Sequence, residues 1–293
     1  MKMFSFVGKG GVGKTTSAAA LALKLSKKGK VLVVSLDPAH NLGDVLATKL
    51  REEPKEIAPN LWAAEPDVDE VIRRFTKEIA EEIKLHYKYL KVLNLDKLIS
   101  ILELSPGVEE QALLEELIKF MNMDFDYLVV DHAPTGIAVR VLSLPSIMLM
   151  WLNSLINLRK EILKKREALA KLRGYEEKLD DPVLKILQEE LERMKRTDEL
   201  IKNPNTHSIY IVLNPEELPV LEGIRIKEML ERAQLPLKAV VVNKYVEEEE
   251  AIYWYNKVLE VFKNTKIFKV PKFKKPPKGI EELAKVAEHL EVV

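Results

Sequence analysis

The chain has 293 residues, enough for one large α/β domain or for one domain with a helical insertion. Its 46 lysines and arginines equal its 46 aspartates and glutamates, so no overall field attracts nucleic acid or an acidic membrane. Cysteine is absent, which excludes disulfides, thiolate metal sites and iron–sulfur clusters.

The start of the chain enters an apolar strand directly, so the sequence predicts no signal peptide. No apolar run approaches the roughly 20 residues that a membrane-spanning helix needs. The five histidines are scattered without the spacing of metal ligands. We therefore expect a cytoplasmic protein that is peripheral to a membrane at most.

The first motif follows the apolar run Met3–Val7, which breaks into glycines and restarts as an alanine-rich helix expected at Ser17–Leu25. Glycines let backbone N–H groups curl around a phosphate chain where a Cβ would block its approach. Lys14 supplies a point charge to the β- and γ-phosphates, and the Thr15 hydroxyl is placed to bind Mg²⁺. Strand, loop and helix together predict a P-loop. Its phosphate-binding residues would be Gly8, Lys9, Gly10, Gly11, Val12, Gly13, Lys14, Thr15 and Thr16.

The same glycines also satisfy G-x-G-x-x-G, the fingerprint of dinucleotide binding, with Asp37 about twenty residues on to hold a ribose hydroxyl. Lys14 and Thr15 would have no role in such a site, and Asp37 is followed by Pro38 rather than by a plain helix. A second acidic residue, Asp131, also ends a later buried strand, as a Mg²⁺-linked carboxylate would. The sequence therefore favours a nucleoside triphosphate.

Further apolar runs read as strands, and several are continuously apolar, as expected for parallel strands covered on both faces. They are Val31–Leu36, Leu61–Ala64, Tyr127–Val130, Ser208–Leu213, Ala239–Val242 and Lys266–Val270. Helical patterns separate most of them, so we predict an α/β fold, a doubly wound parallel sheet of the P-loop NTPase type in one domain over 1–293. Ligands of such sheets bind at the carboxyl ends of the strands. The residues directly after these ends, expected to converge, are Gly8, Asp37, Asp131, Asn214 and Asn243.

Two long stretches exceed a minimal nucleotide-binding domain, and we expect them to form a helical subdomain over 68–123 and 146–202. The first predicts a long one-faced helix, then turns broken at Pro106-Gly107. Its apolar stripe is Val68, Ile72, Phe75, Ile79, Ile83, Tyr87 and Leu90. The second carries the stripes Met148, Trp151, Leu155, Leu158, Ile162 and Leu184, Leu187, Leu191, Met194. The charged segment Lys164–Asp181 between them reads as a helix end and a solvated connection.

Hydrolysis of a γ-phosphate needs a positioned water and compensation of charge on the phosphoryl oxygens. Asp37 is the candidate that orients or deprotonates this water, and Asn41 offers an amide near the same phosphate. Asp131 would hold the hydration shell of Mg²⁺, which makes Thr15, Asp37 and Asp131 the expected metal-site residues. The segment Pro134-Thr135-Gly136 would move with the γ-phosphate as a switch loop. The alternative is that Asp37 and Asp131 are ordinary caps at strand ends.

With these motifs the chain resembles the ATPases of arsenite pumps and of tail-anchored membrane-protein targeting. The matching segments run through almost the whole chain. They are Gly8–Thr16 (a P-loop of the deviant Walker A type with the extra lysine Lys9), Ser35–Asp44, Ser105–Gly107 with Glu109-Glu110, Asp131–Gly136, Arg140–Pro145, Asn214–Leu218 and Val242–Lys244. The first, second and fourth of these are specific when they occur together.

The resemblance implies ATP and Mg²⁺ as cofactors and a homodimer in which Lys9 reaches the phosphates across the subunit interface as a catalytic residue. A lysine that adds charge only when two subunits close would tie hydrolysis to closure. Without the resemblance, Lys9 would be an exposed loop cation. The resemblance also implies that Asn243 and the Val270-Pro271 loop contact adenine, and Asn214 is expected among the nucleotide-binding residues.

The chain departs from the family pattern at the second switch, where His132 replaces a threonine and Ile137 a later histidine. The paired cysteines that bind zinc at the dimer interface of many targeting ATPases are missing, as are those with which arsenite-pump ATPases sense the metalloid. One nucleotide-binding half is present rather than two in tandem. Any dimer must therefore close by packing and charge alone.

The first functional hypothesis is a targeting factor, in which ATP closes the dimer and the helical subdomains form an apolar groove for a client's membrane helix. Candidate groove residues are Met148, Met150, Trp151, Leu152 and Leu155, since flexible thioethers suit varied apolar partners. The alternative for this stripe is packing inside its own subunit.

The second hypothesis is the energising subunit of an arsenite or other anion pump, although a chain without cysteine lacks the thiolate chemistry that recognises arsenite. A third class comprises the related partition and division-site ATPases, which bind DNA or membrane. The lysine-rich run Lys263–Lys278 has few stacking aromatics and reads as an edge of the nucleotide pocket. The helix expected at Ile280–Leu290 is acidic on its polar face, the wrong sign for an anionic membrane. We therefore expect no nucleic-acid partner.

Overall fold

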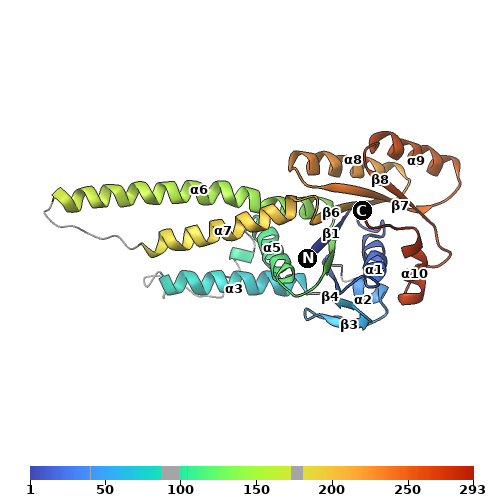
Figure 1. Ribbon diagram of the computed structural model, residues 1–293, viewed down its shortest axis with the longest axis horizontal. Helices are drawn as coiled ribbons and strands as arrows, with labels where there is room; N and C mark the ends of the chain where they lie inside the picture. The colour runs from blue at the N-terminus through green and yellow to red at the C-terminus, as the bar shows by residue number, and fades with distance from the viewer. Residues whose placement is uncertain (40, 87–98, 100, 104, 173–180) are drawn as a thin grey trace.

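The computed structural model describes residues 1–39, 41–86, 99, 101–103, 105–172 and 181–293 (Figure 1). At its centre lies an eight-stranded sheet with the order β3-β4-β2-β5-β1-β6-β7-β8. Neighbouring strands are parallel except for β3 (Lys55–Ala58) and β4 (Leu61–Ala64), which pair antiparallel at one edge. The other strands are β1 (Lys2–Val7), β2 (Val31–Leu36), β5 (Tyr127–His132), β6 (His207–Leu213), β7 (Leu237–Tyr245) and β8 (Lys266–Pro271). The predicted α/β fold with a doubly wound parallel sheet is confirmed, apart from the antiparallel edge strand β3.

Strand prediction succeeded where burial is complete. Every residue of β2 and β6 is buried, so their runs of branched apolar side chains identify them directly. The short strand β3 was missed because its sequence is polar and its first residues are exposed, as suits the edge of a sheet. The predicted ends of β5 and β7 were too early, so Asp131 and Asn243 lie within these strands rather than after them.

Helices cover both faces of the sheet (Figure 1). On one face α1 (Lys14–Leu25) packs against α10 (Ile280–Glu288), and a row of buried alanines, Ala18–Ala20 and Ala22, brings α1 close to the strands. The opposite face is covered by α5 (Val108–Met121), α6 (Thr135–Leu172), α7 (Pro182–Lys202), α8 (Glu217–Arg232) and α9 (Glu249–Val261). The short helix α2 (Leu42–Val45) follows β2, and α3 (Val68–His86) follows β4.

The helices α6 and α7 lie side by side and project together from the sheet, with α3 extending in the same direction (Figure 1). Two hydrogen bonds of 2.7 Å from Arg193 to Glu115 join α7 to α5. Asp181 pairs with Arg159 of α6 and caps α7 by accepting the Leu184 N–H at 2.7 Å. These charged contacts join α5, α6 and α7, and α3 packs against α5. We call the four helices the helical lobe.

The start of α6 corrects two predictions. The helix begins at Thr135, not at Ser146, and Pro145 lies inside it. Proline is tolerated here because Val141, Leu142 and Pro145 are buried against the core, so packing outweighs the lost hydrogen bond. Thr135 and Gly136 of the expected switch loop therefore belong to a helix. Tyr87 and Leu90 of the first stripe, and positions 173–180 of the predicted connection, lie outside the described residues.

Helix α6 also corrects the expectation about apolar length. By length and composition alone, Gly136–Leu172 could cross a membrane, and 28% of its most apolar 18-residue stretch is buried inside the protein. Polar residues interrupt this stretch in the sequence, which is why no apolar run was recognised. Ser143, Asn153 and Ser154 each bond back to a carbonyl one turn earlier in the helix.

Candidate functional site

The predicted P-loop joins β1 to α1 at the centre of the sheet. A Cβ on Gly8, whose φ is 152°, would lie 2.2 Å from the Val212 carbonyl oxygen, and one on Gly13, whose φ is 99°, would lie 2.2 Å from the Asn243 amide nitrogen. Around Gly10 and Gly11, no atom of the described residues lies within 4 Å of an added Cβ. Gly8 and Gly13 thus allow the loop to pack closely, whereas the other two leave open space in which a phosphate fits.

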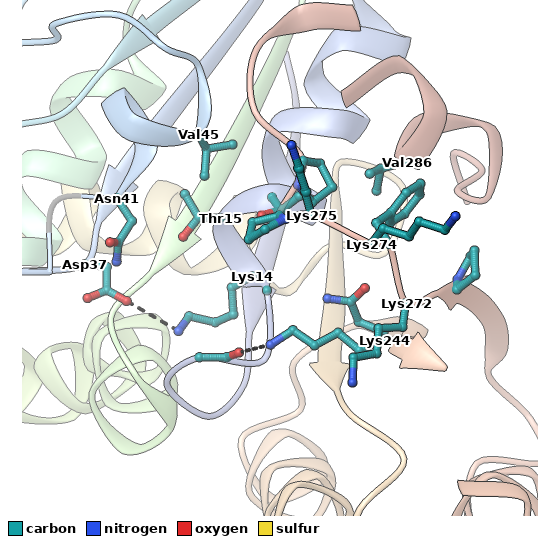
Figure 2. Close-up of a pocket in the computed structure, with 18 residues that line it drawn as sticks. Lys14, Thr15, Asp37, Asn41, Val45, Lys244, Lys272, Lys274, Lys275 and Val286 are labelled. Atoms are coloured by element: carbon teal, nitrogen blue, oxygen red, sulfur yellow. Dashed lines mark hydrogen bonds and ion pairs between the residues drawn. The ribbon is translucent and has the colours of Figure 1, made fainter. Parts of the chain in front are cut away.

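Charged and hydroxyl side chains meet at the first turn of α1. Thr15 Oγ1 donates a hydrogen bond of 2.6 Å to Asp131 Oδ2, and Ser35 Oγ donates to the same oxygen at 3.1 Å. Lys14 Nζ lies 3.4 Å from Asp37 Oδ2 (Figure 2). The other Asp37 oxygen accepts the Ala39 N–H at 3.0 Å. The P-loop, the end of β2 with the residues after it, and the end of β5 therefore meet at this point.

Asp131 is the more deeply buried of the two carboxylates in this group. Burial raises the pKa of Asp131 from 3.8 to about 6, although the Lys14 charge and the Thr15 hydrogen bond oppose the shift. Its Oδ1 is buried and has no hydrogen-bond partner within the described part of the chain. A divalent cation, or a water bound to one, would give this oxygen the partner that it lacks. The site therefore fits Mg²⁺ held near Thr15 and Asp131.

A metal here would depend on the nucleotide as well. Among the described residues no group of three or more histidines and carboxylates could hold a metal. Mg²⁺ takes near-octahedral oxygen coordination and keeps several waters, so phosphate oxygens would supply the remaining ligands. Asp37 was also predicted at the metal, but its two oxygens are engaged by Lys14 and by the Ala39 N–H.

A cavity of about 580 Å³ opens in front of these groups (Figure 2). Nine of the predicted residues line it: Gly11, Gly13, Lys14, Thr15, Thr16, Asp37, Asn41, Asn243 and Pro271. The facing wall is the segment 271–277. It contributes the cationic side chains Lys272, Lys274 and Lys275 to the lining. Phe273 lies in the same wall. This placement agrees with the expectation that the lysine-rich run edges a nucleotide pocket.

Some lining residues were not predicted. Lys244 donates a hydrogen bond of 2.8 Å to the Gly11 carbonyl (Figure 2). The Asn243 amide nitrogen donates to the Val12 carbonyl at 2.7 Å. The end of β7 thus holds the P-loop from the side, so Asn243 already has a structural role besides the expected contact with adenine. Lys244 directly follows Asn243 in Val242–Lys244, one of the segments that resemble the family. That position could have identified Lys244 as a lining residue.

Other predicted residues do not line the cavity, namely Gly8, Lys9, Gly10, Val12, Asp131 and Asn214. Lys9 instead lies 3.9 Å from Glu222 of α8. Asn214 is buried at the end of β6, and its side-chain oxygen has no hydrogen-bond partner in the described regions. Within one subunit, Lys9 is thus turned away from the phosphate-binding turn.

Comparison with known proteins identifies the family. The anion-transporting ATPase family matches this chain over residues 1–292. The chain belongs to this family. It is 35% identical over 253 residues to a protein of Aquifex aeolicus (strain VF5) that carries the name of an arsenical pump-driving ATPase, covering 85% of this chain and 81% of that protein.

Relatives with other names are also similar. Over 269 residues the chain is 32% identical to the ATPase GET3B of Arabidopsis thaliana, covering 83% of this chain and 64% of that protein. An ATPase ASNA1 homolog of Entamoeba dispar is 29% identical over 247 residues, which is 81% of this chain and 74% of that protein. The resemblance read from the sequence is confirmed, and the protein is an ATPase. Membership of this family implies ATP and Mg²⁺, while the names of the relatives divide between two roles.

Proposed function

We propose that this ATPase is a homodimeric switch whose ATP-dependent closure captures the membrane helix of a tail-anchored client. The observation that carries the proposal is a stripe of apolar side chains exposed along α6. Met150 is 73% exposed and Trp151 68%, which is unusual for such large side chains. The stripe continues with Leu155, Leu158, Ile162 and Leu169.

The length of this stripe suits a membrane helix. Trp151 and Leu169 are eighteen residues apart in one helix, which corresponds to about 27 Å at 1.5 Å per residue. The hydrocarbon core of a bilayer is about 30 Å thick, so a client's apolar span is of matching length. Covering the stripe would remove exposed apolar surface from water on both partners.

The predicted groove residues divide between the surface and the core. Met150, Trp151 and Leu155 are exposed, whereas Leu152 is buried and Met148 packs partly against the core. The alternative, that the whole stripe packs inside its own subunit, is therefore wrong for its exposed members. The remaining exposed face supports a role in binding a partner.

The nucleotide site supports the hydrolytic half of the proposal. A triphosphate carries more charge than one carboxylate, so its arrival would draw Lys14 away from Asp37. The released Asp37 carboxylate would then orient a water and accept its proton, and Asn41 would donate its amide N–H to the γ-phosphate. Bound Mg²⁺ would neutralise charge on the phosphate oxygens from its place near Thr15 and Asp131.

Lys9 would complete the site from the partner subunit. Its pair with Glu222 spans 3.9 Å between side chains that are 40% and 27% exposed. Such a solvated pair contributes about 0–1 kcal/mol, so closure of a dimer could break it at little cost. Hydrolysis would then require two subunits, which links turnover to client capture.

A second candidate function is the energising ATPase of an anion pump, which the name of the Aquifex aeolicus relative favours. The absence of cysteine removes the thiolates that would recognise arsenite. We therefore place this candidate second.

Co-expression with a tail-anchored membrane helix tests the first proposal. The wild-type protein should form a soluble complex with the helix, and Trp151→Asp with Leu155→Asp should lose it while ATP hydrolysis persists. The matched control is Leu259→Asp on α9, because Leu259 is 42% exposed and Leu155 43%. A complex that survives the α6 changes, or that the control also loses, would argue against the groove.

A further inference from the structure

Glu65 directly follows β4 and contacts the start of α2. Its Oε1 accepts the Leu42 N–H at 2.7 Å, and its Oε2 accepts the Gly43 N–H at 3.2 Å. The first N–H groups of a helix have no partner within the helix, so this carboxylate satisfies two of them. Because α2 begins directly after Asn41, Glu65 holds the end of the loop that carries Asp37.

The capping role of Glu65 frees the side chain of Asn41. An asparagine at the N-cap normally accepts one of these N–H groups with its own side chain. Asn41 stands at the N-cap of α2 and makes no such hydrogen bond. Its side chain instead lines the nucleotide cavity, as Asp37 does (Figure 2).

The surroundings of Glu65 keep this contact in place. A Cβ on Gly43 would lie 3.1 Å from Glu65 Oε2 and 2.9 Å from the Thr48 carbonyl oxygen, so a larger residue would push the carboxylate away. At the other end of α2, the Val45 carbonyl accepts the Gly279 N–H at 2.8 Å. Gly279 comes shortly after the segment 271–277 that forms the facing wall of the cavity. The helix is thus held at both ends, once by each side of the site.

We infer that Glu65 is a positioning residue for ATP hydrolysis, which caps α2 so that the Asn41 amide faces the γ-phosphate. The inference rests on the proposed role of Asn41. Glu65 has no hydrogen bond or ion pair with Lys14 or Thr15 among those of the described residues. Loss of its carboxylate should therefore lower the turnover rate and leave the affinity for the nucleotide unchanged.

The test measures kcat and the Kd for Mg-ATP in Glu65→Ala and in the isosteric Glu65→Gln. We expect kcat to fall about five- to tenfold, the fold-change that corresponds to the free energy of one lost helix cap. The calorimetric Kd for Mg-ATP should be unchanged. If Glu65 acts through Asn41, the double variant Asn41→Ala with Glu65→Ala should turn over at the rate of Asn41→Ala alone.

Asp67 provides a matched control two residues further on. Its Oδ1 accepts the N–H groups of Asp69 at 3.0 Å and Glu70 at 3.2 Å at the start of α3. Asp67→Ala removes the same kind of cap away from the cavity, so its kcat should equal that of the wild type.

A wild-type kcat in both Glu65 variants, or in Asn41→Ala, would overturn the inference. So would a double variant whose kcat falls by the product of the two single losses, or weaker Mg-ATP binding in Glu65→Gln. A kcat that falls as far in Asp67→Ala as in Glu65→Ala would overturn it too. Absence of hydrolysis by the wild-type protein would instead overturn the proposed function. Glu65→Gln preserves the shape of the side chain, which keeps the test open should Glu65→Ala not fold.

Discussion

Thr15 Oγ1 and Asp131 Oδ2 lie 2.6 Å apart and join the first turn of α1 to the end of β5. This hydrogen bond connects the predicted phosphate-binding turn to a buried carboxylate. Burial raises the pKa of this carboxylate from 3.8 to about 6. We therefore expect Asp131 to destabilise the nucleotide-free protein and to act once Mg-ATP is bound. Functional sites often carry destabilising groups of this kind.

We predict that Asp131→Asn stabilises the nucleotide-free protein at pH 7.5 by on the order of 1–2 kcal/mol, because it removes a buried charge. The pKa of Asp131 is raised in the folded state, so its unfavourable contribution grows as the pH rises from 3.8 through about 6. The gain should accordingly vanish below about pH 4. Urea unfolding at both pH values measures it, and an Asp131→Asn protein less stable than the wild type at pH 7.5 would refute the argument.

The same variant should lose the dependence of nucleotide binding on magnesium. Asp131 Oδ1 is the unpartnered oxygen that a metal-bound water would reach, and asparagine carries no charge to hold it. Calorimetry with ATP in EDTA and in Mg²⁺ should give more similar affinities for Asp131→Asn than for the wild type. Equal enhancement by Mg²⁺ in both proteins would place the metal elsewhere.

Lys14 and Asp37 lie 3.4 Å apart, yet we predict opposite consequences for their substitution. Lys14→Ala should abolish ATP binding, because the buried ammonium is the point charge beside the phosphate turn. Asp37→Asn should keep binding and lower kcat by about 10²-fold or more, the usual contribution of a general base. An Asp37→Asn protein that hydrolyses ATP at the wild-type rate would show that another group positions the water.

We predict that Mg-ATP shifts the protein toward a dimer and that Lys9→Ala lowers kcat without weakening ATP binding. The reason is that Lys9 lies 3.9 Å from Glu222 within its own subunit and does not line its own cavity, so we expect it to act at the cavity of a second subunit. Light scattering with and without nucleotide measures the first effect, and steady-state kinetics the second. A monomer mass in both conditions would remove the role assigned to Lys9.

His132 and His207 predict how stability depends on pH. Their Nε2 atoms lie 3.0 Å and 2.9 Å from Ser5 Oγ, and His207 Nδ1 lies 2.6 Å from the Ile201 carbonyl oxygen. Burial lowers the pKa of His132 from 6.5 to about 3 and that of His207 to about 4, with the His207 and Lys14 charges adding to the shift of His132. Both rings are therefore neutral at pH 7.

Because these two pKa values are lowered, the unfolded chain binds more protons than the folded one between about pH 4 and 6.5, and stability falls as the pH falls through that range. Each histidine should remove on the order of 1–2 kcal/mol between pH 7.5 and 5, partly offset by Asp131 with its raised pKa. In His132→Thr the loss of stability over this range should be smaller than in the wild type. Urea unfolding at both pH values decides it, and equal losses would contradict the prediction.

Elements with a local sequence signal could be predicted from the amino-acid sequence alone. Gly8–Thr16 between a buried strand and an alanine-rich helix identifies the P-loop, because few other patterns combine those glycines with Lys14 and Thr15. The buried strands were found for a similar reason, since complete burial imposes an apolar side chain at nearly every position. Of the five residues expected to converge because parallel strands share a carboxyl edge, Asp37 and Asn243 line the cavity, whereas Gly8, Asp131 and Asn214 do not.

Contacts between distant segments could not be predicted from the sequence, because they depend on how the chain folds. The cap that Glu65 supplies to α2, and the hold of Asn243 on the Val12 carbonyl, depend on which strands become neighbours. The exposure of Trp151 beside the buried Leu152 depends on which face of α6 meets the core. Helical spacing of apolar residues shows that a helix has an apolar face, but not what covers that face. The same side chains can pack against their own subunit or stay exposed until a partner binds.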